Sequence, residues 1–363
     1  MKKTFYISAL CALAFMACRK DDVNPSAKIT ISAPGFYVLN QGVMGVNSAT
    51  LDYYDINAST YYLNIYPAIN PNVVKELGDV GNDLKIYGGK MYAVINGSNK
   101  VEVMHAKTAV RIEQVDIPNC RNITFAGGYA YVSSYAGPVD FGGTNQRGYV
   151  AKIDTATLQK VGECLVGYQP ECLAVVGNKL YVANSGGYQA VRDSTLSVID
   201  LSSFTETTKR LPVGINPDVV QADRHGNLWG TTRGNYVDIE PTLYYVDNQE
   251  VVHTLPSAAA NFCIVGDSLY FYATDYDENF DIVASYGIVN ISTKTVVNTQ
   301  LIADGTSIVT PYGIAVNPIT KDIYITDAKD YVSPGELYCF GTNGTLKWHE
   351  TTGELPAKIA ILW

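Results

Sequence analysis

The chain has few of the residues that usually build metal and nucleotide sites. It has only four histidines (His105, His225, His253 and His349), and no two of them have the spacing of metal ligands on one helix. The sequence also lacks a G-x-S-x-G nucleophile motif, a phosphate-binding loop and a Gly-rich dinucleotide fingerprint. Catalysis is therefore unsupported, and we expect no enzyme activity, no resident cofactor and no metal.

Basic residues are also scarce. Lys and Arg total 26 against 35 Asp and Glu, a net charge of −9 over 363 residues. A nucleic-acid-binding protein needs a basic surface, so that class is excluded. Hydrophobic residues make up 47% of the chain, which is enough to bury a core. Tyr outnumbers Phe by 27 to 10, and we expect these tyrosines on half-exposed strands and wet binding surfaces.

Cysteines are scattered and have no C-x-x-C spacing. Apart from Cys11 and Cys18 near the amino terminus, the chain has Cys120, Cys164, Cys172, Cys263 and Cys339. An odd number without motif spacing predicts neither a disulfide framework nor a zinc site, although a single bridge stays open. Cys172 and Cys263 lie in apolar runs and are predicted to be small core residues.

The amino terminus has the layout of an export signal. Residues 1–3 carry two lysines, and residues 4–17 are apolar, end in small side chains and are too short to span a bilayer. Residues 14–18 (AFMAC) resemble a bacterial lipobox, in which Cys18 would carry lipid; the alternative is an ordinary signal peptide before a chance cysteine. We expect a signal peptide over residues 1–17, then lipidated Cys18 and a flexible tether to residue 33.

Residues 19–22 (RKDD) resemble the signal that directs Bacteroidetes lipoproteins to the outer cell face. This resemblance implies a protein that is lipid-anchored in the outer membrane and exposed on the cell surface. The lipid would be its only attachment to the membrane.

One strand pattern recurs seven times after the tether, at steps of about 40–55 residues that match propeller blades. The copies are 36–40 (FYVLN), 91–96 (MYAVIN), 130–134 (AYVSS), 180–184 (LYVAN), 228–232 (LWGTT), 269–274 (LYFYAT) and 323–327 (IYITD). Six copies follow a short apolar run across a tight turn such as Gly88-Gly89 or Gly127-Gly128, which is hairpin chemistry. The first copy lacks such a run. Residues 357–363 (AKIAILW), at the other end of the sequence, are an apolar run of the same kind that precedes no copy.

The sequence therefore predicts an all-β, seven-bladed β-propeller over residues 34–363, closed by the last strand joining the first blade. An eight-stranded sandwich with a second domain is the alternative, but it would not explain the spare terminal strand. Loops after the second strand are long in six blades (residues 41–50, 135–148, 185–195, 233–241, 275–285 and 328–335), whereas the hairpin turns of the other face are short. Loops on a rigid scaffold often carry function, so the long loops predict one binding face; tolerated insertions are the alternative.

The predicted binding face combines three kinds of side chain. Aromatic rings could stack on a flat ligand, amides could pair with amide or hydroxyl groups, and arginines could hold an anionic group. The candidate ligand-binding residues are Asn40, Gln41, Asn96, Arg121, Tyr135, Asn184, Tyr188, Arg233, Tyr236, Tyr276, Phe280 and Tyr331. Residues 275–281 alternate oxygen ligands like a calcium loop, but Phe280 replaces the sixth-position glycine and Tyr286 the twelfth-position glutamate, so we favour an acidic surface loop.

The mature chain resembles the YncE-like (YVTN-type) propellers found as surface lipoproteins in Bacteroidetes. The resemblance rests on 39–42 (LNQG), 47–51 (NSATL), 53–55 (YYD), 77–80 (LGDV), 312–318 (YGIAVNP), 323–328 (IYITDA) and Asp330-Tyr331. Within that group it is similar to the BtuG lipoproteins, which bind vitamin B12. The resemblance implies capture of corrinoids (cobalamin or cobinamide) and their transfer to a TonB-dependent outer-membrane transporter. A glycan-binding lipoprotein and a protein-interaction propeller without a small ligand are the alternatives.

Overall fold

A computed structural model describes residues 29, 31, 33–73, 76–139, 141–142, 146–279 and 281–363. The predicted signal peptide, Cys18 and nearly all of the tether lie outside these residues, and so does Phe280. The described chain is nearly all β and contains one short helix, α1 (Ile65–Ile69). None of its helices has the length and apolar character needed to cross a membrane.

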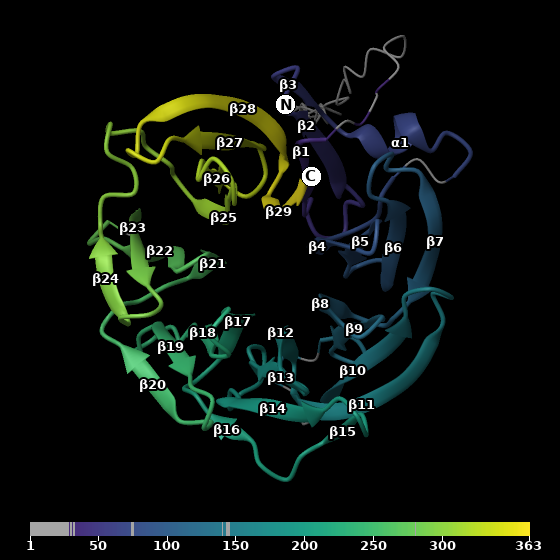
Figure 1. Ribbon diagram of the computed structural model, residues 1–363, viewed down its shortest axis with the longest axis vertical. Helices are drawn as coiled ribbons and strands as arrows, with labels where there is room; N and C mark the ends of the chain where they lie inside the picture. The colour runs from purple at the N-terminus through teal and green to yellow at the C-terminus, as the bar shows by residue number, and fades with distance from the viewer. Residues whose placement is uncertain are drawn as a thin grey trace, which may run out of the picture.

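The described strands form seven sheets arranged as blades around a ring (Figure 1). Blade 1 contains β29 (Pro356–Leu362), β1 (Gly35–Asn40), β2 (Thr50–Asp55) and β3 (Thr60–Tyr62). Blade 2 contains β4 (Gly81–Tyr87), β5 (Lys90–Ile95), β6 (Lys100–His105) and β7 (Arg111–Asp116). Blade 3 contains β8 (Cys120–Ala126), β9 (Tyr129–Ser134), β10 (Arg147–Asp154) and β11 (Lys160–Tyr168).

The remaining blades continue in chain order. Blade 4 contains β12 (Pro170–Val176), β13 (Lys179–Asn184), β14 (Thr195–Asp200), β15 (Thr205–Glu206) and β16 (Leu211–Pro212). Blade 5 contains β17 (Pro217–Ala222), β18 (Leu228–Thr232), β19 (Thr242–Val246) and β20 (Val252–Leu255). Blade 6 contains β21 (Asn261–Val265), β22 (Ser268–Tyr276), β23 (Ile282–Asn290) and β24 (Thr295–Asn298). Blade 7 contains β25 (Pro311–Val316), β26 (Ile323–Asp327), β27 (Pro334–Phe340) and β28 (Leu346–Glu354).

The carboxyl-terminal strand closes the ring. β29 pairs antiparallel with β1, from Gly35 opposite Leu362 to Asn40 opposite Pro356. In Figure 1 it lies at the inner edge of blade 1, facing the middle of the ring, as β4, β8, β12, β17, β21 and β25 do in the other blades. Closure removes the free inner edge that blade 1 would otherwise expose. The predicted seven-bladed propeller and its closing strand are both confirmed.

Tyrosines fill much of the core between the blades. Tyr37, Tyr92 and Tyr244, on β1, β5 and β19, are fully buried. The Tyr37 hydroxyl donates to the carbonyl oxygen of Ala106 in the neighbouring blade at 2.6 Å. The expectation that the tyrosines would be half-exposed is wrong for this group, because a strand inside a propeller is covered by a blade on each side.

The connections divide between two faces. The loops that join second to third strands, and fourth strands to the next blade, lie on one face, which we name the loop face. The hairpin turns lie on the other, and Gly88 and Gly89 have the positive φ angles, 57° and 79°, that their turn requires. The predicted loop over residues 275–285 is shorter than expected, because β22 and β23 continue the hairpin and leave only residues 277–281 outside the ladder.

Candidate ligand-binding site

The inner strands begin on the loop face, and most of them begin with a β-bulge. In the described chain, β4, β8, β12, β17, β25 and β29 each shift register by one residue directly after their first residue; β21 does not. Bulges re-aim side chains and often lie beside functional sites. The second residues of these six strands are Asn82, Arg121, Glu171, Asp218, Tyr312 and Ala357, and in blade 6 Ala260 lies directly before β21; all seven residues line the same cavity.

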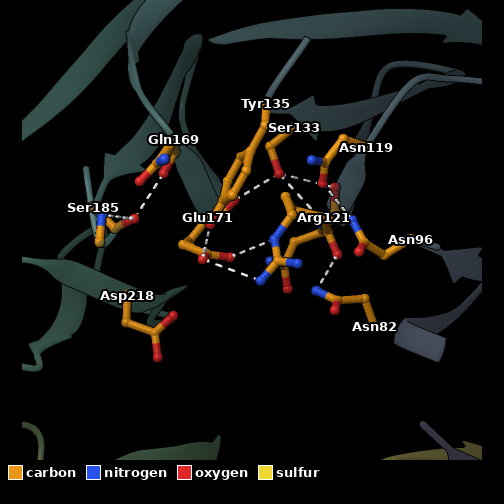
Figure 2. Close-up of polar contacts among 12 residues, drawn as sticks. Asn82, Asn96, Asn119, Arg121, Ser133, Tyr135, Gln169, Glu171, Ser185 and Asp218 are labelled. Carbon is orange, nitrogen blue, oxygen red and sulfur yellow. Dashed lines mark hydrogen bonds and ion pairs between the residues drawn. The ribbon is translucent and has the colours of Figure 1, made fainter. Parts of the chain in front are cut away.

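This central cavity, of about 470 Å³, holds a buried ion pair. Arg121 donates from its Nε to Glu171 Oε2 at 3.0 Å and from Nη2 to Glu171 Oε1 at 3.2 Å, so one guanidinium grips both carboxylate oxygens (Figure 2). The Tyr135 hydroxyl also donates to Glu171 Oε1. The Arg121 guanidinium lies 4.8 Å from the centre of the Tyr135 ring. The three side chains therefore form a rigid unit between blades 3 and 4.

A second ion pair extends this unit into blade 5. Arg233 Nη2 lies 2.8 Å from Asp218 Oδ2, and its Nη1 lies 3.8 Å from Glu171 Oε1. Burial acts to raise the pKa of Glu171, but Arg121 and Arg233 outweigh it and hold that pKa below its usual value. Burial raises the pKa of Asp218, which Arg233 only partly opposes. Two arginines and two carboxylates thus form a chain without net charge when both acids are ionised.

A second cavity, of about 540 Å³, adjoins the first toward blades 5, 6 and 7. The two cavities share Arg233, Tyr236 and Ala260. The second is lined by aromatic rings, of which Tyr236 is 68% exposed and Tyr276 66% exposed. We name it the side cavity. Exposed rings around a rigid opening can stack on a flat apolar ligand.

A neighbouring loop orients Tyr236. The Arg192 guanidinium lies 5.3 Å from the centre of the Tyr236 ring, and Asn216 Nδ2 donates to the Tyr236 hydroxyl at 3.4 Å. Arg192 Nε and Asn216 Oδ1 are buried and have no hydrogen-bond partner among the described residues. Arg192 and Asn216 therefore act on the cavities by holding Tyr236, which lines both of them.

A family model described as "Domain of unknown function (DUF5074)" matches residues 34–354. The chain belongs to this family. The match covers almost all of the propeller but ends before the closing strand β29, which carries the cavity residues Ala357 and Lys358. No curated protein matches the chain.

Solved structures show the same fold at low sequence identity. A quinonprotein alcohol dehydrogenase-like protein from Bacteroides thetaiotaomicron aligns with a TM-score of 0.62 and 16% identity, covering 92% of this chain and 79% of that one. A functionally unknown protein from Desulfotomaculum acetoxidans aligns with a TM-score of 0.61 and 11% identity, covering 91% and 99%. Hydrazine synthase from Kuenenia stuttgartiensis aligns with a TM-score of 0.59 and 15% identity, covering 72% and 77%. These likenesses support the propeller fold alone.

The DUF5074 propeller brings most of the predicted site residues together. Those that line the central cavity are Gln41, Arg121, Tyr188, Arg233 and Tyr236, and those that line the side cavity are Arg233, Tyr236, Tyr276 and Tyr331. Tyr135 is not among the residues that line the two cavities; it is buried and donates a hydrogen bond to Glu171.

Three predicted amides do not reach the site. Asn40 is fully buried and donates to Thr50 Oγ1 and Asp52 Oδ2 within blade 1. Asn184 is fully buried and bonds within blade 4 and to the backbone of Gly167. Asn96 donates to Asn119 and to the Cys120 carbonyl oxygen. Each lies at or just after the end of a second strand and uses its amide for hydrogen bonds to neighbouring protein groups, so the prediction that these residues contact ligand is corrected.

The residues that sequence reasoning missed lie at the starts of the inner strands. Glu171, Asp218 and Tyr312 each follow a proline that opens an inner strand, at Pro170, Pro217 and Pro311. A polar or aromatic residue directly after that proline, before an apolar run, was the available signal. Tyr312 donates from its hydroxyl to Gln41 Oε1 at 2.5 Å and so ties blade 7 to the blade 1 loop.

In the part of the chain that the structure describes, the cysteines and the acidic loop of residues 275–281 have structural roles. The five cysteines of the described chain are free. Cys172 and Cys263 both pack against hydrophobic clusters as predicted, but both are only half-buried, and Cys172 also lines the central cavity. Asp277 Oδ1 accepts backbone N–H groups of Asn279 and Asp281 and so caps its own turn. The described residues contain no cluster of three or more potential metal ligands.

Proposed function

We propose that this chain is a cell-surface lipoprotein that captures a corrinoid and passes it to a TonB-dependent outer-membrane transporter. The proposal rests on the sequence resemblance to vitamin B12-binding propellers and on one structural observation. That observation is the pair of adjoining cavities on the loop face, of about 470 and 540 Å³, which join charged and amide groups to exposed aromatic rings.

A corrinoid has the features that these two cavities complement. It is a broad, flat ring with amides around its edge, and cobalamin carries one phosphate in its tail. The rings of Tyr236, Tyr276 and Tyr331 offer stacking surfaces, and Gln41 and Asn82 offer amide groups. Arg121, Glu171, Asp218 and Tyr312 come from the inner strands of a closed ring, so this part of the site loses little conformational entropy on binding.

Substituting the exposed tyrosines should weaken binding without unfolding the protein. We expect Tyr276→Ala and Tyr188→Ala each to raise the Kd for cobalamin about tenfold, because each removes a ring that is 66% or 42% exposed in the unliganded protein. Calorimetric titration with cobalamin and cobinamide measures this effect, and thermal denaturation should show an unchanged Tm. Ile319→Ala, which truncates a 72% exposed side chain on the opposite face, is the matched control. Unchanged affinity in both tyrosine variants would exclude this face as the site.

A glycan is the second candidate ligand, and the side cavity favours it. Besides tyrosine rings, that cavity is lined by Thr232, Thr274, Asp275 and Glu240, whose oxygens suit sugar hydroxyl groups. Retardation in polysaccharide affinity gels, together with no heat of binding for corrinoids, would identify the glycan. A docked protein partner would give neither signal.

A further inference from the structure

The charges that line the central cavity do not cancel. Among the described lining residues, the cations are Arg121, Arg233 and Lys358, and the carboxylates are Glu171 and Asp218. Arg121 is hydrogen-bonded to Glu171, and Arg233 forms an ion pair with Asp218 at 2.8 Å. One positive charge, that of Lys358, is therefore left over at the centre of an acidic protein.

Lys358 makes no side-chain hydrogen bond or ion pair with any described residue. It lies on β29, the closing strand, opposite Leu39 of β1, and its side chain is half-buried. It is close enough to Asp218 to act on that carboxyl electrostatically, although Arg233 is the direct partner of Asp218. Because the Lys358 ammonium group lines the cavity and has no counter-ion among the described residues, a bound anion would pair with it without displacing a protein carboxylate.

From this arrangement we infer that Lys358 is the anchor of an oxyanion subsite in the central cavity. Arg121 and Arg233 were predicted to hold the ligand's anionic group, but they already neutralise Glu171 and Asp218 and instead fix the shape of the cavity. The inference deepens the proposed function, since the phosphodiester of cobalamin would occupy this subsite while its ring faces the side cavity. The same subsite would accept a free oxyanion if the ligand is not a corrinoid.

The first experiment uses pyrophosphate as the probe and needs no corrinoid. Pyrophosphate at about 10 mM should raise the Tm of the wild-type protein by about 2 °C relative to sodium chloride at matched ionic strength. Lys358→Met should lose this rise, and Lys358→Arg should keep it. Lys107→Met, which removes an exposed lysine from a turn on the opposite face, is the control and should respond like the wild type. An equal rise in Lys358→Met and Lys107→Met, or none in the wild type, would overturn the inference.

The second experiment asks whether the ligand's own phosphate occupies the subsite. Calorimetric titration should show that Lys358→Met raises the Kd for cobalamin about tenfold. The Kd for cobinamide, which lacks the phosphodiester, should change by less than twofold. Equal losses for both ligands would contradict that placement. If neither corrinoid binds the wild type, the proposed function is wrong. The pyrophosphate comparison still tests whether Lys358 anchors an oxyanion subsite.

Discussion

Raising the pH above about 10 is expected to unfold the propeller, although the protein should be insensitive to pH between about 7 and 9. Burial raises the pKa of Tyr37, Tyr181, Tyr244 and Tyr272 well above the value of 10 for an exposed tyrosine, and it raises the pKa of Tyr92 to about 12. The stability from each group is therefore fully present below pH 10 and is lost as the pH rises toward its folded-state pKa. A shift of two units corresponds to about 2.7 kcal/mol for each tyrosine.

The sum over several tyrosines is comparable with the whole stability of a domain, which is about 5–15 kcal/mol. Circular dichroism and the ultraviolet absorbance of tyrosinate, recorded together across an alkaline titration, measure this effect. The account predicts that the buried tyrosines ionise in the same cooperative transition in which the β signal is lost. Tyrosines that all titrate near pH 10 while the β signal persists would show that these hydroxyls are not buried in solution.

Replacing Glu171 by Gln is expected to lower the free energy of unfolding by about 3 kcal/mol. The substitution keeps the shape of the side chain but removes the charge that Arg121 grips through two hydrogen bonds. Glu171 is 3% exposed, and the Arg121 side chain is 16% exposed, so the arginine would be left largely out of water without its counter-ion. Urea denaturation measures the change.

A matched control lies on the outer strand of blade 2. Glu113 is 56% exposed and lies 3.8 Å from Arg111, so Glu113→Gln should change stability by less than about 0.5 kcal/mol. Adding Arg121→Met to Glu171→Gln should recover part of the loss, because no unpaired charge then remains. Equal effects of Glu171→Gln and Glu113→Gln would contradict the buried ion-pair chain.

The blade repeat was predictable because it depends on local chemistry. Each blade contains the apolar–aromatic strand, and in six blades a Gly- or Asn-containing hairpin turn precedes it. The closing strand was predictable by elimination, since residues 357–363 had the pattern of an inner strand and the first copy lacked one. Both inferences are confirmed by the pairing of β29 with β1.

The site was less predictable because the sequence does not distinguish a polar side chain that stabilises a loop from one that binds a ligand. Asn184 and Gln41 both lie near the ends of second strands, yet Asn184 bonds within its own blade and Gln41 lines the cavity. Glu171 and Asp218 were missed because their meeting depends on how neighbouring blades align their inner strands. The spacing of residues along the chain does not show which inner-strand residues of neighbouring blades face each other.

Hydrogen exchange in the presence and absence of cobalamin tests most directly whether the loop-face cavities are the binding site. The account predicts slower exchange over residues 185–194, 233–241 and 328–333, and at the start of β17, with no change in the hairpin turns of the opposite face. Protection confined to those turns, or no protection at saturating cobalamin, would contradict it.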